Sequence, residues 1–490
     1  MKRLQTLLIF QLMVLSLFAQ NNSWQKVLMN VDDFELFDVK EDKDGNYLLA
    51  TTAKRKNHWT KSYSLLYRIG KSGVDIDSVK LQDSLRSVYY SSLIPLENSE
   101  FLAIGASYDS LANIEVKLII QSFTNSFEQL WIKTFSVPQE LRFPAIKSRI
   151  DNGAGYLIFG EIYLPDNRFT PFIAQFDTNF LMTNWKLPSP NMFGTYRDVK
   201  KLNDSTFWAL RLAPWRFERL DPAFNILTYY YLPTYGYGDI SVKWLNNSTF
   251  IYLTKYVHQQ TSGTSILHNL GLVRQNDPFD TTGSLFVPWR VSDTVDHQAA
   301  FRGIDFIHPD TIFAGGTRNL NVQNPYFASQ PTWFIVYQTD SLFNLRWERF
   351  YGGDACYVMT NLLATSDGGC LIGGSRYDYL NASEQKRDIV ILKLDKHGLI
   401  TNLPERATNL QIRESLVYPN PGGDVMHIRI AVQHAVARLM LFDTNGRQVL
   451  EQALQGTEHT INTSMLQNGT YLYKLTSPTG LNESGKWIKH

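Results

Sequence analysis

The body of the chain repeats one short hydrophobic pattern. A turn is followed by an aromatic or apolar residue, and then by an apolar run that tends to end in small residues. The pattern occurs seven times, with starts about 54 residues apart on average, at 47–50, 101–105, 156–160, 207–210, 250–253, 312–316 and 370–374. A recurring period of this size indicates a propeller or a solenoid, in which each repeat supplies one structural unit.

A second pattern recurs in phase with the first and predicts the rest of each repeat. A turn that contains aspartate lies at 176–180, 220–224, 339–343 and 394–398, where we place the connection between the third and fourth strands. Strands that contain tryptophan follow such turns at 130–135, 183–187 and 345–350. Four strands per unit make a blade, so the sequence predicts a seven-bladed β-propeller over residues 20–401.

The last repeat lacks its fourth strand, and the start of the chain can supply it. After 390–394 and the turn that follows, the chain continues into 402–405 without a tryptophan strand. Residues 24–28 have the missing pattern, so we expect them to pair with the last blade and close the ring. Such closure hides a sheet edge that would otherwise invite aggregation.

The first residues have the layout of a secretory signal peptide. Lys2 and Arg3 precede an apolar run from Leu7 to Phe18. At about a dozen residues this run is shorter than the roughly 20 needed to cross a bilayer. We therefore expect residues 1–19 to be removed after Ala19, and we expect no membrane span in the mature protein.

Residues 417–490 follow a different pattern and predict a small C-terminal antiparallel β-sandwich. Met426, Ile428 and Ile430 alternate with polar or small residues, as in a half-buried strand. The dipeptide at 445–446, Asn-Gly, supplies the positive φ that a tight hairpin requires. The expected fold is therefore all-β, with residues 402–416 as a linker between propeller and sandwich.

Four segments of this module carry a resemblance to a known family. They contain Tyr418, Pro419, Asn420 and Pro421; Asp443, Gly446 and Arg447; Gly469 and Tyr471; and Gly485 and Lys486. In order and spacing they resemble the type A C-terminal sorting domain of the type IX secretion system of Bacteroidetes. The resemblance implies passage through the periplasm, recognition by the secretion machinery and removal of the module by a sortase-like peptidase. The mature protein would then be secreted or held at the outer cell surface.

The body of the chain carries a weaker resemblance to a known family, and the net charge of the chain limits the kinds of partner that it is expected to bind. Residues 366–374, with flanks at 351–354 and 388–395, resemble the repeat of bacterial cell-surface β-propellers. The chain has 47 Lys and Arg against 46 Asp and Glu, a net charge of +1. No overall field therefore favours nucleic acid or an anionic membrane, and we expect neither as a partner.

The two cysteines are not expected to form a disulfide. If 366–369 is a hairpin turn, Cys370 pairs near Ala364, and Cys356 lies about eight residues further up the strand. At about 3.3 Å per residue the separation is roughly 25 Å, far beyond the reach of a disulfide.

No pattern for catalysis or for a cofactor stands out. The ten histidines form no metal-binding pair, and the chain has no Gly-x-Ser-x-Gly elbow or phosphate-binding loop before a helix. The segment 42–46 lacks the acidic twelfth residue of a calcium loop, since Ala53 stands there, and is interpreted as a β-turn. We assign no catalytic residue, no metal and no cofactor.

Two sets of residues are candidates for ligand contact. An aromatic group on which a sugar ring could stack comprises Trp215, Tyr229, Tyr230, Tyr235 and Tyr237, with Asp239 beside it. Packing between blades is the alternative role of this group. Carboxylates at the starts of expected inner strands are Asp32, Asp33, Asp198, Asp239, Asp305 and Asp354. They could meet at one mouth of the ring and bind a cation or act as acid and base, or they could be solvated turn residues.

Three hypotheses for function follow. The chain is an exported protein that binds a glycan or a protein, an exported enzyme that acts on polysaccharide with paired carboxylates, or a scaffold of a surface assembly. An enzyme should place two carboxylates in contrasting environments within a deep pocket. A binding protein should present an aromatic shelf, and a scaffold a large apolar patch. We favour the binding protein.

Overall fold

The computed structural model describes most of the chain, and its strands form the fold. It covers residues 23–54, 62–83, 85–96, 98–109, 116–137, 142–149, 155–163, 169–188, 193–213, 215–232, 240–259, 266–279, 283–286, 295–400, 412–431 and 434–490. The expected signal peptide, residues 1–19, lies outside this part of the chain. No α-helix occurs within the ranges given.

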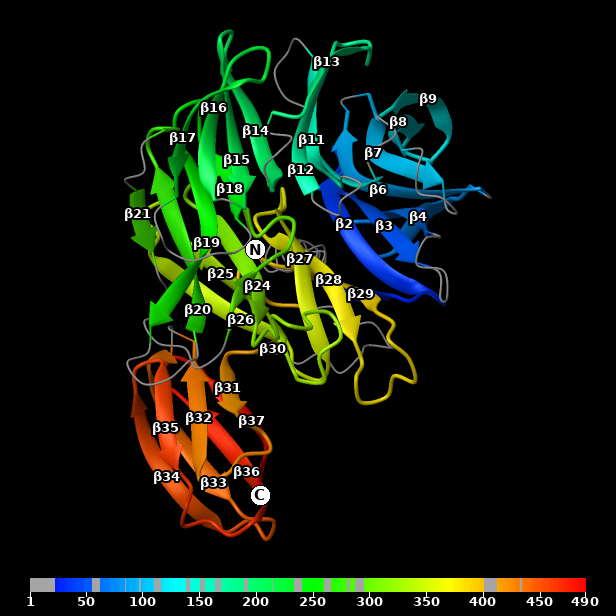
Figure 1. Cartoon of the computed structure of the whole chain (residues 1–490). Helices are drawn as coiled ribbons and strands as arrows, with labels where there is room; N and C mark the ends of the chain where they lie inside the picture. The colour runs from blue at the N-terminus through cyan, green and yellow to red at the C-terminus, as the bar shows by residue number, and fades with distance from the viewer. Residues whose placement is uncertain are drawn as a thin grey trace, which may run out of the picture.

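Seven antiparallel sheets follow one another along the body and form the blades (Figure 1). Blade 1 contains β2 (Asp33–Glu41), β3 (Tyr47–Lys54), β4 (Ser62–Ile69) and β5 (Asp75–Leu81). Blade 2 contains β6 (Arg86–Pro95), β7 (Glu100–Asp109), β8 (Val116–Thr124) and β9 (Gln129–Ser136). Blade 3 contains β10 (Arg142–Arg149), β11 (Tyr156–Tyr163), β12 (Phe169–Phe176) and β13 (Met182–Lys186).

The remaining blades repeat this order, with one irregularity in blade 6. Blade 4 contains β14 (Thr195–Asn203), β15 (Thr206–Leu212), β16 (Arg216–Leu220) and β17 (Ile226–Tyr231). Blade 5 contains β18 (Ser241–Trp244), β19 (Phe250–Gln259), β20 (Ile266–Gln275) and β21 (Gly283–Phe286). Blade 6 has a divided inner strand, β22 (His297–Gln298) and β23 (Ile304–Asp305), followed by β24 (Ile312–Arg318), β25 (Trp333–Thr339) and β26 (Leu345–Gly352). Blade 7 contains β27 (Cys356–Ala364), β28 (Cys370–Tyr377) and β29 (Asp388–Leu394).

The N-terminal strand β1 (Trp24–Leu28) is the fourth strand of blade 7. It pairs antiparallel with β29, with Trp24 opposite Lys393 and Leu28 opposite Ile389, which is the pairing that the sequence predicted. The buried Trp24 indole donates a hydrogen bond to the carbonyl of Lys71, in the turn between β4 and β5 of blade 1, at 2.9 Å. The first strand therefore joins the last blade to the first one.

The aspartate turns have a clear physical basis. Asp177 accepts hydrogen bonds from the backbone N–H groups two and four residues further on, at 2.9 and 2.8 Å, and Asp340 does the same at 2.8 Å. The residues three positions after them, Phe180 and Phe343, have φ of 57° and 64°. Such values are unfavourable for a phenylalanine, but both rings are buried between blades, which offsets the cost.

The small residues of the repeated pattern are required where an inner strand bulges toward its neighbour. The register of β27 and β28 shifts between Met359 and Asn361, opposite Gly374. A Cβ atom on Gly374 would lie 2.1 Å from the carbonyl oxygen of Val358, so only glycine fits. Gly105 in blade 2 is confined in the same way, 2.0 Å from the carbonyl oxygen of Tyr89.

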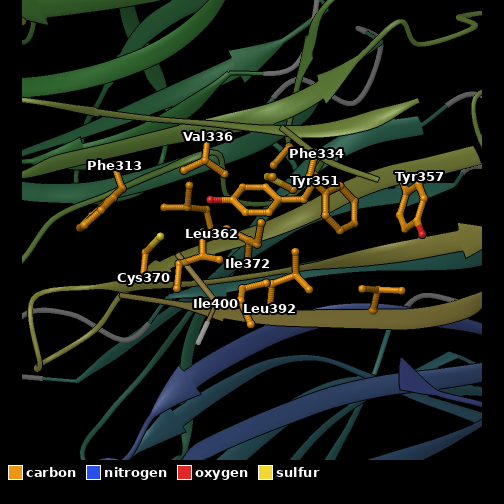
Figure 2. Packing of buried hydrophobic residues seen from close by; sticks show 14 of the residues in the cluster. Phe313, Phe334, Val336, Tyr351, Tyr357, Leu362, Cys370, Ile372, Leu392 and Ile400 are labelled. Carbon is orange, nitrogen blue, oxygen red and sulfur yellow. The ribbon is translucent and has the colours of Figure 1, made fainter. Parts of the chain in front are cut away.

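The hydrophobic core is divided into layers between adjacent blades. Figure 2 shows the layer between blades 6 and 7, which contains Phe313, Phe334, Val336, Tyr351, Leu362, Cys370, Ile372 and Leu392. Cys370 lies opposite Ala364, whereas Cys356 lies opposite Tyr377 at the other end of the same hairpin. Both thiols are buried and unbridged, as predicted, and burial raises the pKa of each.

The C-terminal module is a sandwich of two sheets, shown in orange and red in Figure 1. One sheet contains β31 (Ser415–Tyr418), β32 (Val425–Ile430) and β35 (Glu458–Asn462); the other contains β34 (Gln448–Gln455), β33 (Val436–Phe442), β36 (Gly469–Thr476) and β37 (Asn482–Lys489). The predicted fold class, a seven-bladed propeller followed by a small sandwich, is confirmed. A short strand before the module, β30 (Ile412–Arg413), pairs with β26 of blade 6. The domain limits at 401 and 416 stay predictions, because residues 401–411 lie outside the described part.

Candidate functional site

A cavity of ≈ 610 Å³ opens among the inner strands of the propeller. Its walls come from blades at opposite sides of the ring, including Asp38 on β2, Asp198 on β14, Lys243 on β18 and Asn361 on β27. The volume lies within the range of ordinary small-ligand sites.

Bulges in the inner strands turn several side chains toward this cavity. The strand register shifts by one residue in blades 1, 2 and 4, and the extra residues are Phe37, Ser91 and Arg197. All three line the cavity. A bulge re-aims a side chain and leaves a strand locally unpaired, which suits a ligand site.

Each of the three carboxylates that line the cavity links its own blade to the next blade. The acceptor and donor pairs are Asp38 Oδ2 with the Leu93 N–H at 2.9 Å, Asp305 Oδ2 with the Ala364 N–H at 3.1 Å, and Asp198 Oδ2 with the Trp244 indole N–H at 3.3 Å. These acids therefore act first as structural acceptors between blades.

The divided inner strand of blade 6 carries an arginine into the cavity. Residues 300–302 leave the sheet between β22 and β23, and the N–H groups of Phe301 and Arg302 donate to the carbonyl of Thr360 in blade 7 at 2.9 and 3.1 Å. The Arg302 guanidinium then reaches blade 1, where it donates to Asp38 Oδ1 at 3.1 Å and to the carbonyl of Val39 at 3.3 Å. This loop thus connects three blades across the cavity wall.

Positive charge predominates among the described residues that line the cavity. There are five cationic side chains, Lys40, Lys54, Arg197, Lys243 and Arg302, against the three carboxylates. Lys243 Nζ lies 2.6 Å from Asp305 Oδ1, and Lys40 Nζ lies 3.2 Å from Asp38 Oδ2. Burial, and next the nearby Arg302, lower the pKa of Lys40 to about 8.

Aromatic rings form one part of the cavity wall. Phe37 from blade 1 stacks on Phe301 from the blade 6 loop, with centroids 5.3 Å apart and an interplanar angle of 19°. Tyr89 of blade 2 lies beside Phe37 at 6.2 Å. The cavity therefore combines an apolar wall with a cationic one.

The carboxylates predicted from the sequence separate into two groups. Asp198 and Asp305 line the cavity. The other described carboxylates, Asp32, Asp33 and Asp354, are not cavity residues. Asp32 accepts a hydrogen bond from the Tyr63 hydroxyl at 2.9 Å. Asp33 is paired with Arg387 at 2.6 Å, and Asp354 with Arg376 at 3.1 Å. Asp239 lies outside the described residues.

The described members of the aromatic group predicted from the sequence are not cavity residues. Tyr229 and Tyr230 are on β17, the outermost strand of blade 4, with exposed fractions of 48% and 36%. The Arg216 guanidinium lies 4.3 Å from the Tyr229 ring centroid. Trp215 is half-buried just before β16. Tyr235, Tyr237 and Asp239 lie outside the described residues, and ligand binding by this group stays a prediction.

Most of the residues that line the cavity were not predicted from the sequence. Asp38, Lys40, Lys243 and Arg302 were not predicted as site residues. The alternation of Asp38 and Lys40 two positions apart marks a polar strand face, which was an available signal. No sequence pattern indicates the loop that places Arg302. This loop replaces part of the inner strand of blade 6, where the repeated pattern is weak.

The segments of the C-terminal motif meet in space. Asn420 Oδ1 accepts from the Ile488 N–H at 2.9 Å, and its side-chain amide donates to the carbonyl of Lys486 at 2.7 Å. The Trp487 indole donates to the carbonyl of Pro419 at 2.7 Å. The entry of the module, from Tyr418 to Pro421, is therefore fixed on its last strand.

The other motif residues are also required by the local structure. Asp443 Oδ1 accepts from the Arg447 N–H at 3.0 Å, across a turn in which Gly446 has φ of 79°. A Cβ atom on Gly485 would lie 2.4 Å from the Tyr473 hydroxyl. The Tyr471 hydroxyl donates to the carbonyl of Gln467 at 2.7 Å, and Gly469 begins the same strand, β36.

The family model for the Secretion system C-terminal sorting domain matches residues 416–490. These residues are a sorting domain of that family. Such a domain directs type IX export, so the protein is delivered to the cell surface or secreted. No helix among the residues that the structure describes is long and apolar enough to cross a membrane.

Beyond the sorting domain, the chain resembles known proteins only distantly. No curated protein matches the chain. Among solved structures, YCF48 from Cyanidioschyzon merolae is 11% identical over 76% of this chain and 98% of its own, with a TM-score of 0.40. The WD40 domain of SCAP from fission yeast is 10% identical over 76% and 98%, with a TM-score of 0.37. PorZ, a surface component of the type-IX secretion system of Porphyromonas gingivalis, is 9% identical over 95% and 100%, with a TM-score of 0.15. Similarity at this level supports no functional transfer.

The sorting domain is docked on blade 6 through a cluster of four buried charges, which we call the interface quartet. It consists of Asp296, Arg318 and Glu348 from the propeller and Arg429 from β32 of the sorting domain, each with no more than 1% of its side chain exposed. Arg429 donates to Glu348 Oε1 at 3.0 Å, and Arg318 donates to Asp296 Oδ2 at 3.1 Å. Glu458 of the sorting domain adds a third acid, 3.8 Å from Arg429, and burial raises the pKa of Glu348 to about 8.

Proposed function

We propose that this chain is an exported binding protein whose ligand site is the central cavity of the propeller. The observation that supports the proposal is that the acids and the cations of the cavity have different roles. Its carboxylates are hydrogen-bonded to neighbouring blades, whereas the partly exposed cations Arg302 and Lys243 line the cavity together with an aromatic wall. The ligand is a glycan or a protein segment that enters the cavity.

The carboxylate bonds favour binding over catalysis. A general acid or base must gain or lose its proton toward the substrate during the reaction. Asp38 and Asp305 each accept a backbone N–H from the next blade, and each is also paired with a cation, Arg302 or Lys243. Proton transfer by either acid would disturb the contact between two blades.

Delivery is the second part of the proposal. Residues 1–19 direct the chain to the periplasm, the type IX machinery recognises the sorting domain, and a sortase-like peptidase cuts between propeller and sorting domain. The family match at 416–490 supports this route. A chain that lacks residues 417–490 should remain in the periplasm of a producing strain, and its appearance in the medium would contradict the route.

A glycan array and a peptide array tested with the full chain would identify the ligand. The site is then tested with Ser91→Phe, which places a ring in the cavity at a position whose hydroxyl has no partner among the described residues. The matched control is Ser205→Phe, in an exposed turn of blade 4. We expect Ser91→Phe to lose binding and Ser205→Phe to retain it.

Retained binding by Ser91→Phe would place the ligand site outside the cavity. If Ser91→Phe is folded and still binds, the ligand site lies elsewhere on the protein. The exposed tyrosines of β17 would then be the next candidates, because Tyr229 and Tyr231 present large ring surfaces to solvent. If no array member binds and no variant changes any interaction, the proposal of a binding protein is wrong.

A further inference from the structure

We infer that the ligand of the central cavity is an anionic saccharide, held by Arg302, Lys243 and Lys40. The inference rests on the proposed function, since it names the chemical class of the ligand in the same site. It depends on three observations: a surplus of positive charge, unused donors on those cations, and a wall suited to a sugar ring.

Cations outnumber carboxylates at the place where a ligand would sit. Five cationic groups and three carboxylates line the cavity, and a fourth acid, Glu35, which is not a lining residue, pairs with Lys54 at 3.2 Å. The carboxylate charge is also partly taken up by backbone and indole N–H groups from neighbouring blades. In a cavity that is only partly open to water, such an excess favours an anion.

Lys243 and Arg302 have more N–H donors than their known hydrogen bonds and ion pairs use. Lys243 has three N–H donors, and its ammonium is paired with Asp305 on one side. Arg302 has five donors, and its two known bonds go to Asp38 and to the carbonyl of Val39. Exposed fractions of 40% for Lys243 and 28% for Arg302 leave both groups accessible to a ligand. A carboxylate, sulfate or phosphate group could therefore bind them without displacing Asp38 or Asp305.

The remaining wall suits a saccharide better than a simple ion. Ser62 and Ser91 line the cavity, and their hydroxyl oxygens are closed to solvent and have no hydrogen-bond partner among the described residues. Unpaired buried hydroxyls are costly, so a rotation of either side chain toward the cavity would let a sugar hydroxyl donate to it and accept from it. The rings of Phe37 and Tyr89 add an apolar surface to the cavity wall. A volume of ≈ 610 Å³ has room for more than a single inorganic anion.

Titration calorimetry of the full chain tests the inference with defined probes. The anionic probes are trigalacturonate, a chondroitin sulfate tetrasaccharide and mannose 6-phosphate. The uncharged counterpart is the methyl ester of trigalacturonate, and triglutamate tests an acidic peptide. We expect at least one anionic saccharide to bind, with affinity at least tenfold above its uncharged counterpart and above triglutamate.

Two variants and a control connect binding to the named residues. Arg302→Gln and Lys243→Gln should each weaken the anionic saccharide at least tenfold. Arg346→Gln, which removes an exposed arginine on β26, should leave the affinity unchanged. Lys243→Gln serves as the second test if the loss of Arg302 disturbs the blade 6 loop.

The possible failures are distinguishable. If an uncharged sugar binds in the cavity as well as the acidic one, or if both variants bind normally, the anionic class is wrong and the proposed function stands. If triglutamate is the preferred probe, the ligand is an acidic peptide and the saccharide is excluded. If all probes and both arrays are silent, the inference and the proposed function fail together.

Discussion

Two of the clusters of paired charges among the described residues, the interface quartet and the central cavity, differ in burial and in composition. In the interface quartet, Arg318 and Arg429 have exposed fractions of 1% and 0% and face two equally buried acids. In the central cavity, Arg302 and Lys243 have exposed fractions of 28% and 40%, and cations outnumber carboxylates. Charges that are closed to water serve to hold two parts of the protein together. Partly exposed cations that outnumber the acids around them remain available for a ligand.

The physical cost of the two clusters differs accordingly. Each ion buried in the quartet loses its hydration, and only its partners compensate for that loss. Each pair in the cavity joins a partly exposed cation to a buried carboxylate, with exposed fractions of 28% for Arg302 and 6% for Asp38, so the cation keeps part of its hydration while the acid depends on its hydrogen bonds. Removing one member should therefore have opposite consequences in the two places: a loss of stability at the interface, and a loss of binding in the cavity.

The largest effect is expected for Arg429→Ala. It leaves Asp296 and Glu348 buried with Arg318 as their one described counter-ion in the quartet. Loss of a partner from a buried pair costs about 3–5 kcal/mol, and the sorting domain should undock before the propeller unfolds. Differential scanning calorimetry would show a new transition at lower temperature. The control is Arg438→Ala, since Arg438 has an exposed fraction of 62% in its pair with Glu451 and should cost less than about 1 kcal/mol.

A cleavage experiment provides an independent check of the quartet. A protease site inserted between residues 402 and 411 would allow the connection to be cut after purification. The wild-type fragments should remain together in gel filtration, while those carrying Arg429→Ala should separate. Separation of the wild-type fragments would contradict a structural role for the quartet.

A smaller effect on stability is expected inside the cavity for Asp38→Ala. The substitution removes the acceptor of the Leu93 N–H, 2.9 Å from the carboxylate, and leaves a buried donor without a partner. A cost of about 2–3 kcal/mol follows from such a loss. Urea unfolding should show it, whereas Arg302→Gln should change stability by less than about 1 kcal/mol. Equal costs for the two variants would erase the distinction between structural acids and ligand-binding cations.

The repeat of the propeller could be predicted because its steric demands recur in every blade. Gly374 and Gly105 stand where an inner strand approaches too closely for any Cβ, and Asp177 and Asp340 fix turns in the same register. Such residues leave a periodic signal. The sorting motif was recognisable for the same reason, since Asn420 and the last strand depend on each other for hydrogen bonds.

The cavity and the interface could not be predicted because their residues come together only through the closed ring. Arg302 meets Asp38, which is 264 positions away, and Arg429 meets Glu348, which is 81 positions away. Neither pair has a spacing that a local pattern could encode. The predicted carboxylates were chosen by position along strands, so Asp198 and Asp305 were found, whereas Asp33 proved to be paired with Arg387 away from the cavity.

The pH dependence of binding should distinguish the cavity from the interface more finely. The pKa of Lys40, about 8, means that its positive charge is lost as the pH rises from 7 to 9. Affinity for an anionic saccharide should fall several-fold over this range. Stability should change with the opposite sign, because the unfolded chain, with a lysine pKa of 10.5, binds more protons than the folded one between pH 8 and 10.5.

The matched variant for this titration is Lys40→Gln. It should bind more weakly at pH 7 and show a flat pH profile between 7 and 9. Parallel calorimetry and urea unfolding at each pH would separate loss of charge from loss of structure. A profile that is unchanged by Lys40→Gln would show that another group titrates in the cavity.

The smallest effect is expected for the double substitution Tyr229→Ser and Tyr231→Ser on the outer strand of blade 4. Both rings are exposed, at 48% and 57%, and they stack edge to face on each other, 5.4 Å apart, on the outermost strand and not on the cavity wall. Stability should fall by about 0.5–1 kcal/mol, because the Tyr229 ring also lies 4.3 Å from the Arg216 guanidinium, and the affinity of the cavity for an anionic saccharide should not change. A loss of binding in this variant, with Arg302→Gln unaffected, would place the ligand on the aromatic strand. The charges of the cavity would then be structural, as those of the interface are.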